Sequence, residues 1–256
     1  MPNTQDPIDL VLERLEFPYS PALLGLGMSS TVGLLQYIYS VFLVRREGRG
    51  PFPLWMHTFY LAHDTTWAYK IAFETETSYP EHWFLQLMPI GLSVWSALEI
   101  YCLYKSVTVE RAAVFGRYAY FGGKTPTAAQ AVGVILLLIL AMYAVVLTGL
   151  IIMGENCMME WFALTNILMV IGPTLDWMER GLRRGLSVGL ALVSLFGIVS
   201  AFSPYGLWVT GLPEVFDCEL YYLIGGLFTV VGVVDLAVVL GYPGKTREAW
   251  KPAPIW

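Results

Sequence analysis

The sequence predicts an all-α membrane protein, a single domain built as a bundle of seven transmembrane helices. Of its 256 residues 56% are hydrophobic and only 14% are charged, whereas about a quarter of the residues of a soluble domain are charged. Seven apolar runs, each near the roughly 20 residues that a helical span requires, follow one another along the chain. Their approximate limits are 21–44, 53–73, 83–104, 129–152, 158–178, 185–206 and 219–241.

Lys and Arg fall in alternate connections between these runs, and the connections at about 74–82, 153–157 and 207–218 contain none. Because positively charged connections stay in the cytosol, we expect a lumenal or external N-terminus and a cytosolic C-terminus. The first nineteen residues are acidic and lack signal-peptide features, so the first run is expected to direct insertion, into the endoplasmic reticulum or another endomembrane. The basic residues of the cytosolic connections and tail are Arg45, Arg46, Arg49, Lys105, Arg111, Arg117, Lys124, Arg180, Arg183, Arg184, Lys245, Arg247 and Lys251.

Ionisable side chains interrupt the second apolar run. An Asp or Lys at membrane depth costs about 2.5–3.5 kcal/mol on insertion scales, so it normally faces a partner or a water-filled cavity. At helical spacing His57, Tyr60, Asp64 and Trp67 share one face, and His63 is expected to point about 100° away from Asp64. No basic residue lies one turn from Asp64, and a carboxyl group buried without a cation favours its neutral form, which can donate a proton.

Two further acids lie in other runs at comparable depth. Glu99 falls in the third run one turn after Trp95, and Asp235 falls in the cytosolic half of the seventh run. Together with Asp64 they indicate one polar chamber that opens toward the cytosol. In an alternative interpretation Glu99 is structural, held by Lys105 or by an aromatic hydroxyl group.

Other residues have structural interpretations. Asp176 is expected to pair with Arg180 four residues later. Cys157 and Cys218 both lie in connections on the oxidising side, where they either form a disulfide or remain as thiols. Small residues allow close contact between membrane helices, and the glycines expected to do so are Gly25, Gly27, Gly225 and Gly226.

Several functional classes lack their signatures. The net charge of −5 argues against a nucleic-acid partner. The chain has no HExxH, CxxC or P-loop sequence, no lysine in the seventh run for a retinal Schiff base, and no DRY-like or NPxxY-like receptor sequence. Because the three histidines are scattered, we expect no metal and no cofactor; the expected partners are a lipophilic small molecule and membrane lipids.

One sequence, Trp95-Ser96-Ala97-Leu98-Glu99, places an aromatic residue before an intramembrane acid, and Asp235 places a second acid in the last run. With the chain length and the seven runs, this arrangement resembles the small integral-membrane terpene cyclases of fungal meroterpenoid and indole-diterpene pathways. In that family the aromatic residue directly precedes the acid, whereas here three residues separate them. The stretch from His57 to Asp64 has no counterpart in the family's pattern.

The resemblance implies an isomerase or lyase of terpenoid secondary metabolism that cyclises a prenylated or epoxidised substrate. Asp64 or Glu99 would protonate an olefin or epoxide, and the other acid or Asp235 would orient it or accept the final proton. The substrate-binding residues would be His57, Tyr60, His63, Trp67 and Trp95, because aromatic faces stabilise cations.

Two alternatives stay open. A sterol-type isomerase of the emopamil-binding kind also pairs intramembrane acids with His and Trp, but it uses fewer spans. A non-enzymatic transporter, receptor or lipid-binding scaffold would use the acids as structural groups or as proton carriers.

Overall fold

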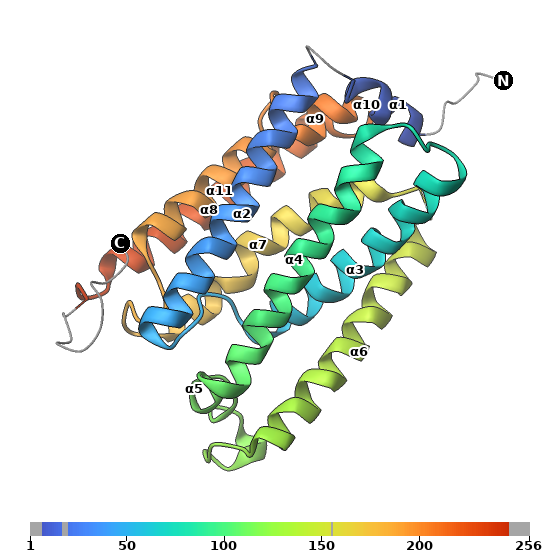
Figure 1. Cartoon of the computed structure of the whole chain (residues 1–256). Helices are drawn as coiled ribbons and strands as arrows, with labels where there is room; N and C mark the ends of the chain where they lie inside the picture. The colour runs from blue at the N-terminus through green and yellow to red at the C-terminus, as the bar shows by residue number, and fades with distance from the viewer. Residues whose placement is uncertain (1–6, 17–19, 155, 246–256) are drawn as a thin grey trace. The chain divides into compact units, whose positions relative to one another are not determined.

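The computed structural model describes residues 7–16, 20–154 and 156–245, and within these ranges it is all-α, with no strand (Figure 1). The predicted cytosolic residues Arg247 and Lys251 lie outside them. The helices are α1 (Pro7–Arg14), α2 (Pro21–Glu47), α3 (Leu54–Thr77), α4 (Trp83–Thr108), α5 (Arg111–Phe115), the 3-10 turn η1 (Ala119–Phe121), α6 (Ala128–Met153), α7 (Met158–Glu179), α8 (Val188–Ala201), α9 (Leu207–Gly211), α10 (Pro213–Phe216) and α11 (Glu219–Gly241).

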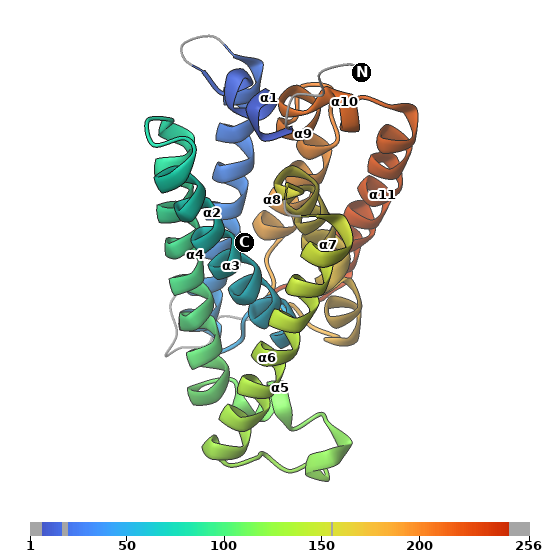
Figure 2. The same cartoon turned by 90° about the vertical axis from the view of Figure 1, so that its right-hand side faces the viewer.

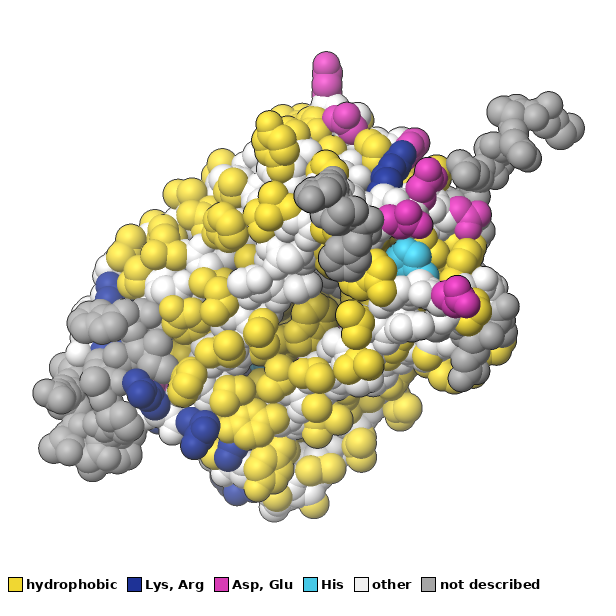
Figure 3. Space-filling model, turned by 45° about the horizontal axis from the view of Figure 1, so that its top comes forward, with side chains coloured by type: hydrophobic (Ala, Val, Ile, Leu, Met, Phe, Trp, Pro, Cys, Tyr) yellow, Lys and Arg dark blue, Asp and Glu magenta, His cyan; other side chains and the backbone are white. Residues whose placement is uncertain are grey.

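Five of these helices, α2, α4, α6, α7 and α11, are long and apolar enough to cross a membrane. The most apolar stretch of α6 has only 11% of its residues buried, and hydrophobic side chains cover much of the visible surface of the helices (Figure 3). Exposed apolar surface of this extent is unfavourable in water. The structure therefore indicates a membrane protein, in agreement with the class that the sequence predicts.

The other two predicted spans are helical but differ from these five. α3 has 24 residues, and its polar side chains keep it out of the apolar class. α8 has only 14 residues, about 21 Å of helix, although the predicted run covers 185–206. Its ends explain the difference: the Ser187 hydroxyl accepts a 2.9 Å bond from the Leu190 amide at the start, and Phe202 ends the helix at the C-cap.

The chain predicted to form one bundle divides into two compact units. The first unit contains the described residues of Met1–Tyr39 and Glu155–Thr246, and the second contains Ser40–Gly154. Helix α2 passes from the first unit into the second.

In the second unit α3 packs against α4 and against α6, so the three helices lie side by side (Figure 2). Their shared apolar core also includes α5; it consists of Leu54, Leu61, Leu103, Phe115, Ala131 and Ile135. A 2.7 Å hydrogen bond between the Thr65 and Tyr143 hydroxyl groups joins α3 to α6. Helix α6 begins with a capping box between Thr127 and Gln130, which satisfies amide groups that the first turn leaves open.

In the first unit α11 packs against α8 and α7, and the short helix α1 contacts α9. Arg183 joins the connection between α7 and α8 to the end of α11: its guanidinium donates to the carbonyl oxygens of Val239, at 2.7 Å, and Leu240, at 3.0 Å. The Tyr242 hydroxyl group donates to the Trp177 carbonyl at 2.7 Å. The ends of α7 and α11 and the connection between α7 and α8 therefore lie together.

Each unit has one basic end. In the second unit the connections after α2 and α4 meet where the Gly50 amide donates to Glu110 Oε2 at 2.6 Å. In the first unit the basic end consists of the connection between α7 and α8 and the residues that follow α11, which Arg183 joins. The basic residues at the two ends are Arg45, Arg46, Arg49, Lys105, Arg111, Arg117 and Lys124 in the second unit and Arg180, Arg183, Arg184 and Lys245 in the first.

Candidate functional site

The predicted polar stripe of α3 is buried inside the second unit. His57, Tyr60 and Asp64 have only 5%, 7% and 4% of their surfaces exposed, and their spacing of three and four residues keeps them on one face. Trp67, one turn further, is 1% exposed. A helix that buries three titratable side chains must provide partners for them inside the protein.

Glu99 of α4 is the partner of His57. The His57 Nδ1 and Glu99 Oε2 atoms are 2.5 Å apart, and Glu99 is 2% exposed. The ammonium group of Lys105, one of the structural partners predicted for Glu99, lies over the Tyr101 and Tyr104 rings instead. The two side chains therefore form a buried pair that joins α3 to α4.

His63 and Asp64 form a second buried pair. The His63 Nδ1 and Asp64 Oδ1 atoms are 2.8 Å apart, so the prediction that His63 points away from Asp64 was wrong. The helical angle between adjacent residues describes where their Cβ atoms point, but the longer imidazole side chain swings back to the carboxyl group. One face of the His63 ring stacks on the Phe59 ring, with 5.9 Å between the ring centroids.

The two pairs lie along one buried face of α3. Tyr60 lies one turn from His57 and one turn from Asp64 on that face. The structure therefore brings together the predicted acids Asp64 and Glu99 with Tyr60, His57 and His63. We call these five residues the α3–α4 cluster. Trp95, half-buried, precedes Glu99 by one turn of α4.

Asp235, the third predicted acid, belongs to the first unit. It is 5% exposed; its Oδ2 atom lies 3.1 Å from the Thr174 hydroxyl oxygen of α7, and its Oδ1 atom has no hydrogen-bond partner among the described residues. Thr174 also donates to the Val170 carbonyl oxygen at 3.0 Å. The meeting of Asp235 with Asp64 and Glu99 stays a prediction.

Three other residue sets have structural roles. Asp176 accepts two bonds from Arg180, at 2.9 Å and 2.5 Å, so the predicted pair is confirmed. No disulfide joins Cys157 and Cys218, both of which the structure describes. Sequence reasoning missed the GxSxG spacing of Gly185-Leu186-Ser187-Val188-Gly189; the Ser187 hydroxyl group accepts the Leu190 amide and caps α8.

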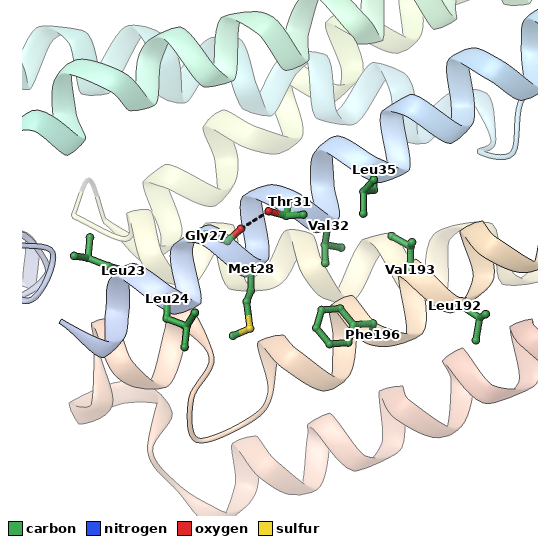
Figure 4. A pocket seen from close by; sticks show the side chains of 10 residues that line it. All are labelled: Leu23, Leu24, Gly27, Met28, Thr31, Val32, Leu35, Leu192, Val193 and Phe196. Carbon is green, nitrogen blue, oxygen red and sulfur yellow. Dashed lines mark hydrogen bonds between the residues drawn. The ribbon is translucent and has the colours of Figure 1, made fainter. Parts of the chain in front are cut away.

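An apolar groove lies in the first unit between α2 and α8 and encloses about 530 Å³. It shares no residue with the α3–α4 cluster. One polar group faces it, the Thr31 hydroxyl, which donates to the Gly27 carbonyl oxygen at 2.7 Å (Figure 4). Such walls suit a hydrocarbon chain and offer no group for chemistry.

Metal ligands are not grouped in the described ranges: no three His, Cys, Asp or Glu side chains there could hold one ion. The α3–α4 cluster instead contains two carboxyl groups, each within hydrogen-bond distance of an imidazole ring. Such pairs hold and transfer protons, which is the arrangement required for general acid–base chemistry.

Sequence reasoning missed Glu110. It is 5% exposed and accepts the Gly50 amide at 2.6 Å, although it lies in the polar connection after α4. Its position in the sequence could have singled it out, because Glu110 is the one acidic residue in that basic connection, 105–128.

No family model, no curated protein and no solved structure matches this chain, so its function has to be inferred from the site itself.

Proposed function

We propose that the chain is an integral membrane enzyme that carries out acid–base chemistry on a lipophilic substrate, with terpene cyclisation as the leading reaction. The observation that supports this is the α3–α4 cluster, in which two buried carboxyl groups each contact a histidine. Structural carboxyl groups in membrane helices are costly, and two adjacent pairs exceed what one helix contact needs.

In the proposed reaction Asp64 or Glu99 donates a proton to an olefin, or to the oxygen of an epoxide, whose C–O bond then breaks. The resulting carbocation is attacked by a neighbouring double bond, so a ring C–C bond forms. The last cation loses a proton to the carboxylate of the other acid or of Asp235, which leaves an alkene. Tyr60 would orient the donor acid, and the Trp67 and Trp95 rings would stabilise the cation, by about 2 kcal/mol where desolvated.

The membrane arrangement is also part of the proposal: seven spans, with α3 and α8 as the second and sixth, a lumenal N-terminus and a cytosolic C-terminus in an endomembrane. It is supported by the basic end of each unit, since Lys and Arg mark the cytosolic side. In this arrangement the α3–α4 cluster lies between mid-membrane and the cytosolic surface, because His57 is close to the start of α3.

Double-bond isomerisation of a sterol-like substrate is the second candidate. It is favoured by the pairing of each acid with a histidine, because isomerisation requires one group to add a proton and another to remove a proton from the same molecule. Both reactions use the same residues and differ only in whether a ring closes.

Product analysis tests the proposal. Membranes containing the protein are incubated in D2O with polyprenyl chains and farnesyl-type epoxides, and separately with sterols that differ in double-bond position. The cyclase predicts cyclic products, and the isomerase predicts a shifted double bond with deuterium incorporated. Asp64→Asn and Glu99→Gln should insert at the wild-type level and lose product, while Glu214→Gln, whose ion pair with Arg14 is on the surface, should keep it. Unchanged substrates in every incubation would refute both reactions.

A further inference from the structure

The apolar groove between α2 and α8 is a binding site that the proposed chemistry does not use. Val32 of α2, only 8% exposed, forms its floor, and the exposed side chains of Leu24, Leu192 and Phe196 form its rims (Figure 4). We propose that this groove holds one acyl chain of a membrane phospholipid. The bound chain takes no part in the proposed reaction and contacts none of the residues that carry it.

Two contacts hold α2 and α8 together at the floor of the groove. A Cβ atom on Gly197 would lie 2.7 Å from Val32 Cγ1, so the backbone of α8 lies directly against the Val32 side chain. The Gln36 side-chain amide donates to the Ser194 hydroxyl oxygen at 3.2 Å, and both residues are buried. The groove is therefore a closed-bottomed depression in which a chain contacts two helices, whereas a chain on the outer face of one helix contacts only that helix.

The size of the groove fits a single hydrocarbon chain. Its lining on α2 runs from Leu23 to Leu35, about 18 Å of helix, which is close to half of the roughly 30 Å hydrocarbon core of a bilayer. Spread over that length, the volume of about 530 Å³ gives a mean cross-section of about 30 Å² and a width of about 6 Å. A helix with its side chains is about 10–12 Å across, so a helix of a second copy is too wide to enter the groove.

The chemistry of the lining also favours a hydrocarbon chain. The hydroxyl group of Thr31, the only polar side chain of the lining, already donates to the Gly27 carbonyl oxygen at 2.7 Å. A polar head group therefore finds no partner inside the groove. Leu23 lies two residues after the start of α2, so the head group lies beyond this end, which in the proposed topology is the lumenal surface of the membrane.

Gly27 offers a way to close the groove. A Cβ atom on Gly27 would have no neighbour within 4 Å, so the phenyl ring of Gly27→Phe can enter the groove without a clash, and Gly27→Leu repeats the test with a smaller side chain. Gly226 of α11 has equally open surroundings and does not line the groove, so Gly226→Phe is the matched control. Thr31→Val keeps the shape of the side chain and removes its hydroxyl group.

The experiment measures phospholipid binding to the purified, delipidated full chain by native mass spectrometry, with dioleoyl phosphatidylcholine as the probe. We expect the wild type to bind one lipid. Gly27→Phe should weaken this binding about tenfold, the loss that corresponds to about two displaced methylene groups. Gly226→Phe and Thr31→Val should bind like the wild type, and glycerophosphocholine, the head group without its chains, should not compete.

A wild-type protein that binds no lipid overturns the proposal, as do wild-type affinity in both Gly27 variants and equal losses in Gly27→Phe and Gly226→Phe. Weaker binding in Thr31→Val would mean that the ligand makes a polar contact. A dimer that Gly27→Phe disrupts would mean that a second copy covers the groove, and either result would replace the acyl chain. None of these measurements needs turnover, so a failure of the proposed reaction leaves the lipid site standing, and a failure of the lipid site leaves the reaction standing.

Discussion

The contact between His57 and Glu99 illustrates how a single buried pair constrains this protein. Both residues are nearly without solvent exposure, so the attraction between them has to offset the desolvation of two polar groups. Such pairs contribute little net stability, but removal of one member leaves the other buried without its partner. A need for stability therefore does not explain the pair, which is consistent with the proposed proton transfer.

This reasoning predicts a strongly non-additive pair of substitutions. His57→Leu or Glu99→Leu alone should lower the free energy of unfolding by about 3–5 kcal/mol, because each strands a buried polar group. The double variant H57L/E99L should be much closer to the wild type, since an apolar pair needs no partner. Thermal unfolding in detergent of the three variants measures this, and losses that simply add would contradict it.

The ion pair between Arg14 and Glu214 predicts a small pH effect in the first unit. The Arg14 guanidinium donates to both carboxylate oxygens, at 2.7 Å and 2.6 Å, and these bonds lower the pKa of Glu214 from 4.5 to about 2. The stabilisation is therefore complete above the unfolded pKa and is lost as the pH falls from 4.5 toward 2. Because the Glu214 side chain is 51% exposed, the ion pair should stabilise the fold by less than about 1 kcal/mol.

The measurement is thermal unfolding in detergent at pH 7 and pH 3 for the wild type and Glu214→Gln. The difference between the two proteins should shrink at pH 3. If the unfolding temperatures of the two proteins differ by the same amount at pH 7 and at pH 3, the charge of the Glu214 carboxylate is not what Arg14 stabilises.

At the level of helices, glycine positions determine how closely α11 approaches α8. A Cβ atom on Gly225 would lie 2.3 Å from Phe202 Cβ, and one on Gly25 would lie 2.5 Å from the Leu207 amide nitrogen, so these two predicted packing contacts are confirmed. Gly27 and Gly226 have no such neighbour within 4 Å, and for them the prediction was wrong. Composition alone does not distinguish a glycine in a contact from one on an open face.

We predict opposite effects for adjacent substitutions in α11. Gly225→Ala should lower the free energy of unfolding by about 1–3 kcal/mol, because the methyl group overpacks against Phe202. Gly226→Ala should leave it unchanged or slightly raised, since Ala is the better helix former and the site is open. Unfolding of the two variants in detergent checks this, and equal losses would contradict the close approach.

Hydropathy predicted where the helices lie, because an apolar run of membrane length is a property of the local sequence. It did not predict the end of α8, since the predicted run continued to residue 206, whereas the helix ends at Ala201 with Phe202 as its C-cap. The contact between His57 and Glu99 could not be predicted from the sequence for another reason. It joins residues 42 positions apart and depends on the alignment of α3 with α4, which no local pattern encodes.

At the level of the whole molecule, the short helix α8 decides the topology. A hydrocarbon core of about 30 Å requires some 20 residues, and α8 provides 14. The proposed seven spans require the non-helical residues at its ends to complete the crossing, with polar groups such as the Ser187 hydroxyl satisfying backbone amides there. If α8 enters and returns without crossing, the connections before and after it lie on the same side.

Cysteine labelling distinguishes these arrangements with residues of the first unit alone. Cys218 is exposed, whereas Cys102 and Cys157 are buried, and Leu182, before α8, is 50% exposed. In vesicles with the cytosolic face outward, an impermeant maleimide should label Leu182→Cys at once, in a Cys218→Ser background. It should label the native Cys218 only after permeabilisation. Equal labelling of both sites in sealed vesicles would mean that α8 does not cross, and the reversed order would place the basic ends in the lumen. Either outcome would contradict the proposed topology, so labelling should precede the search for a substrate.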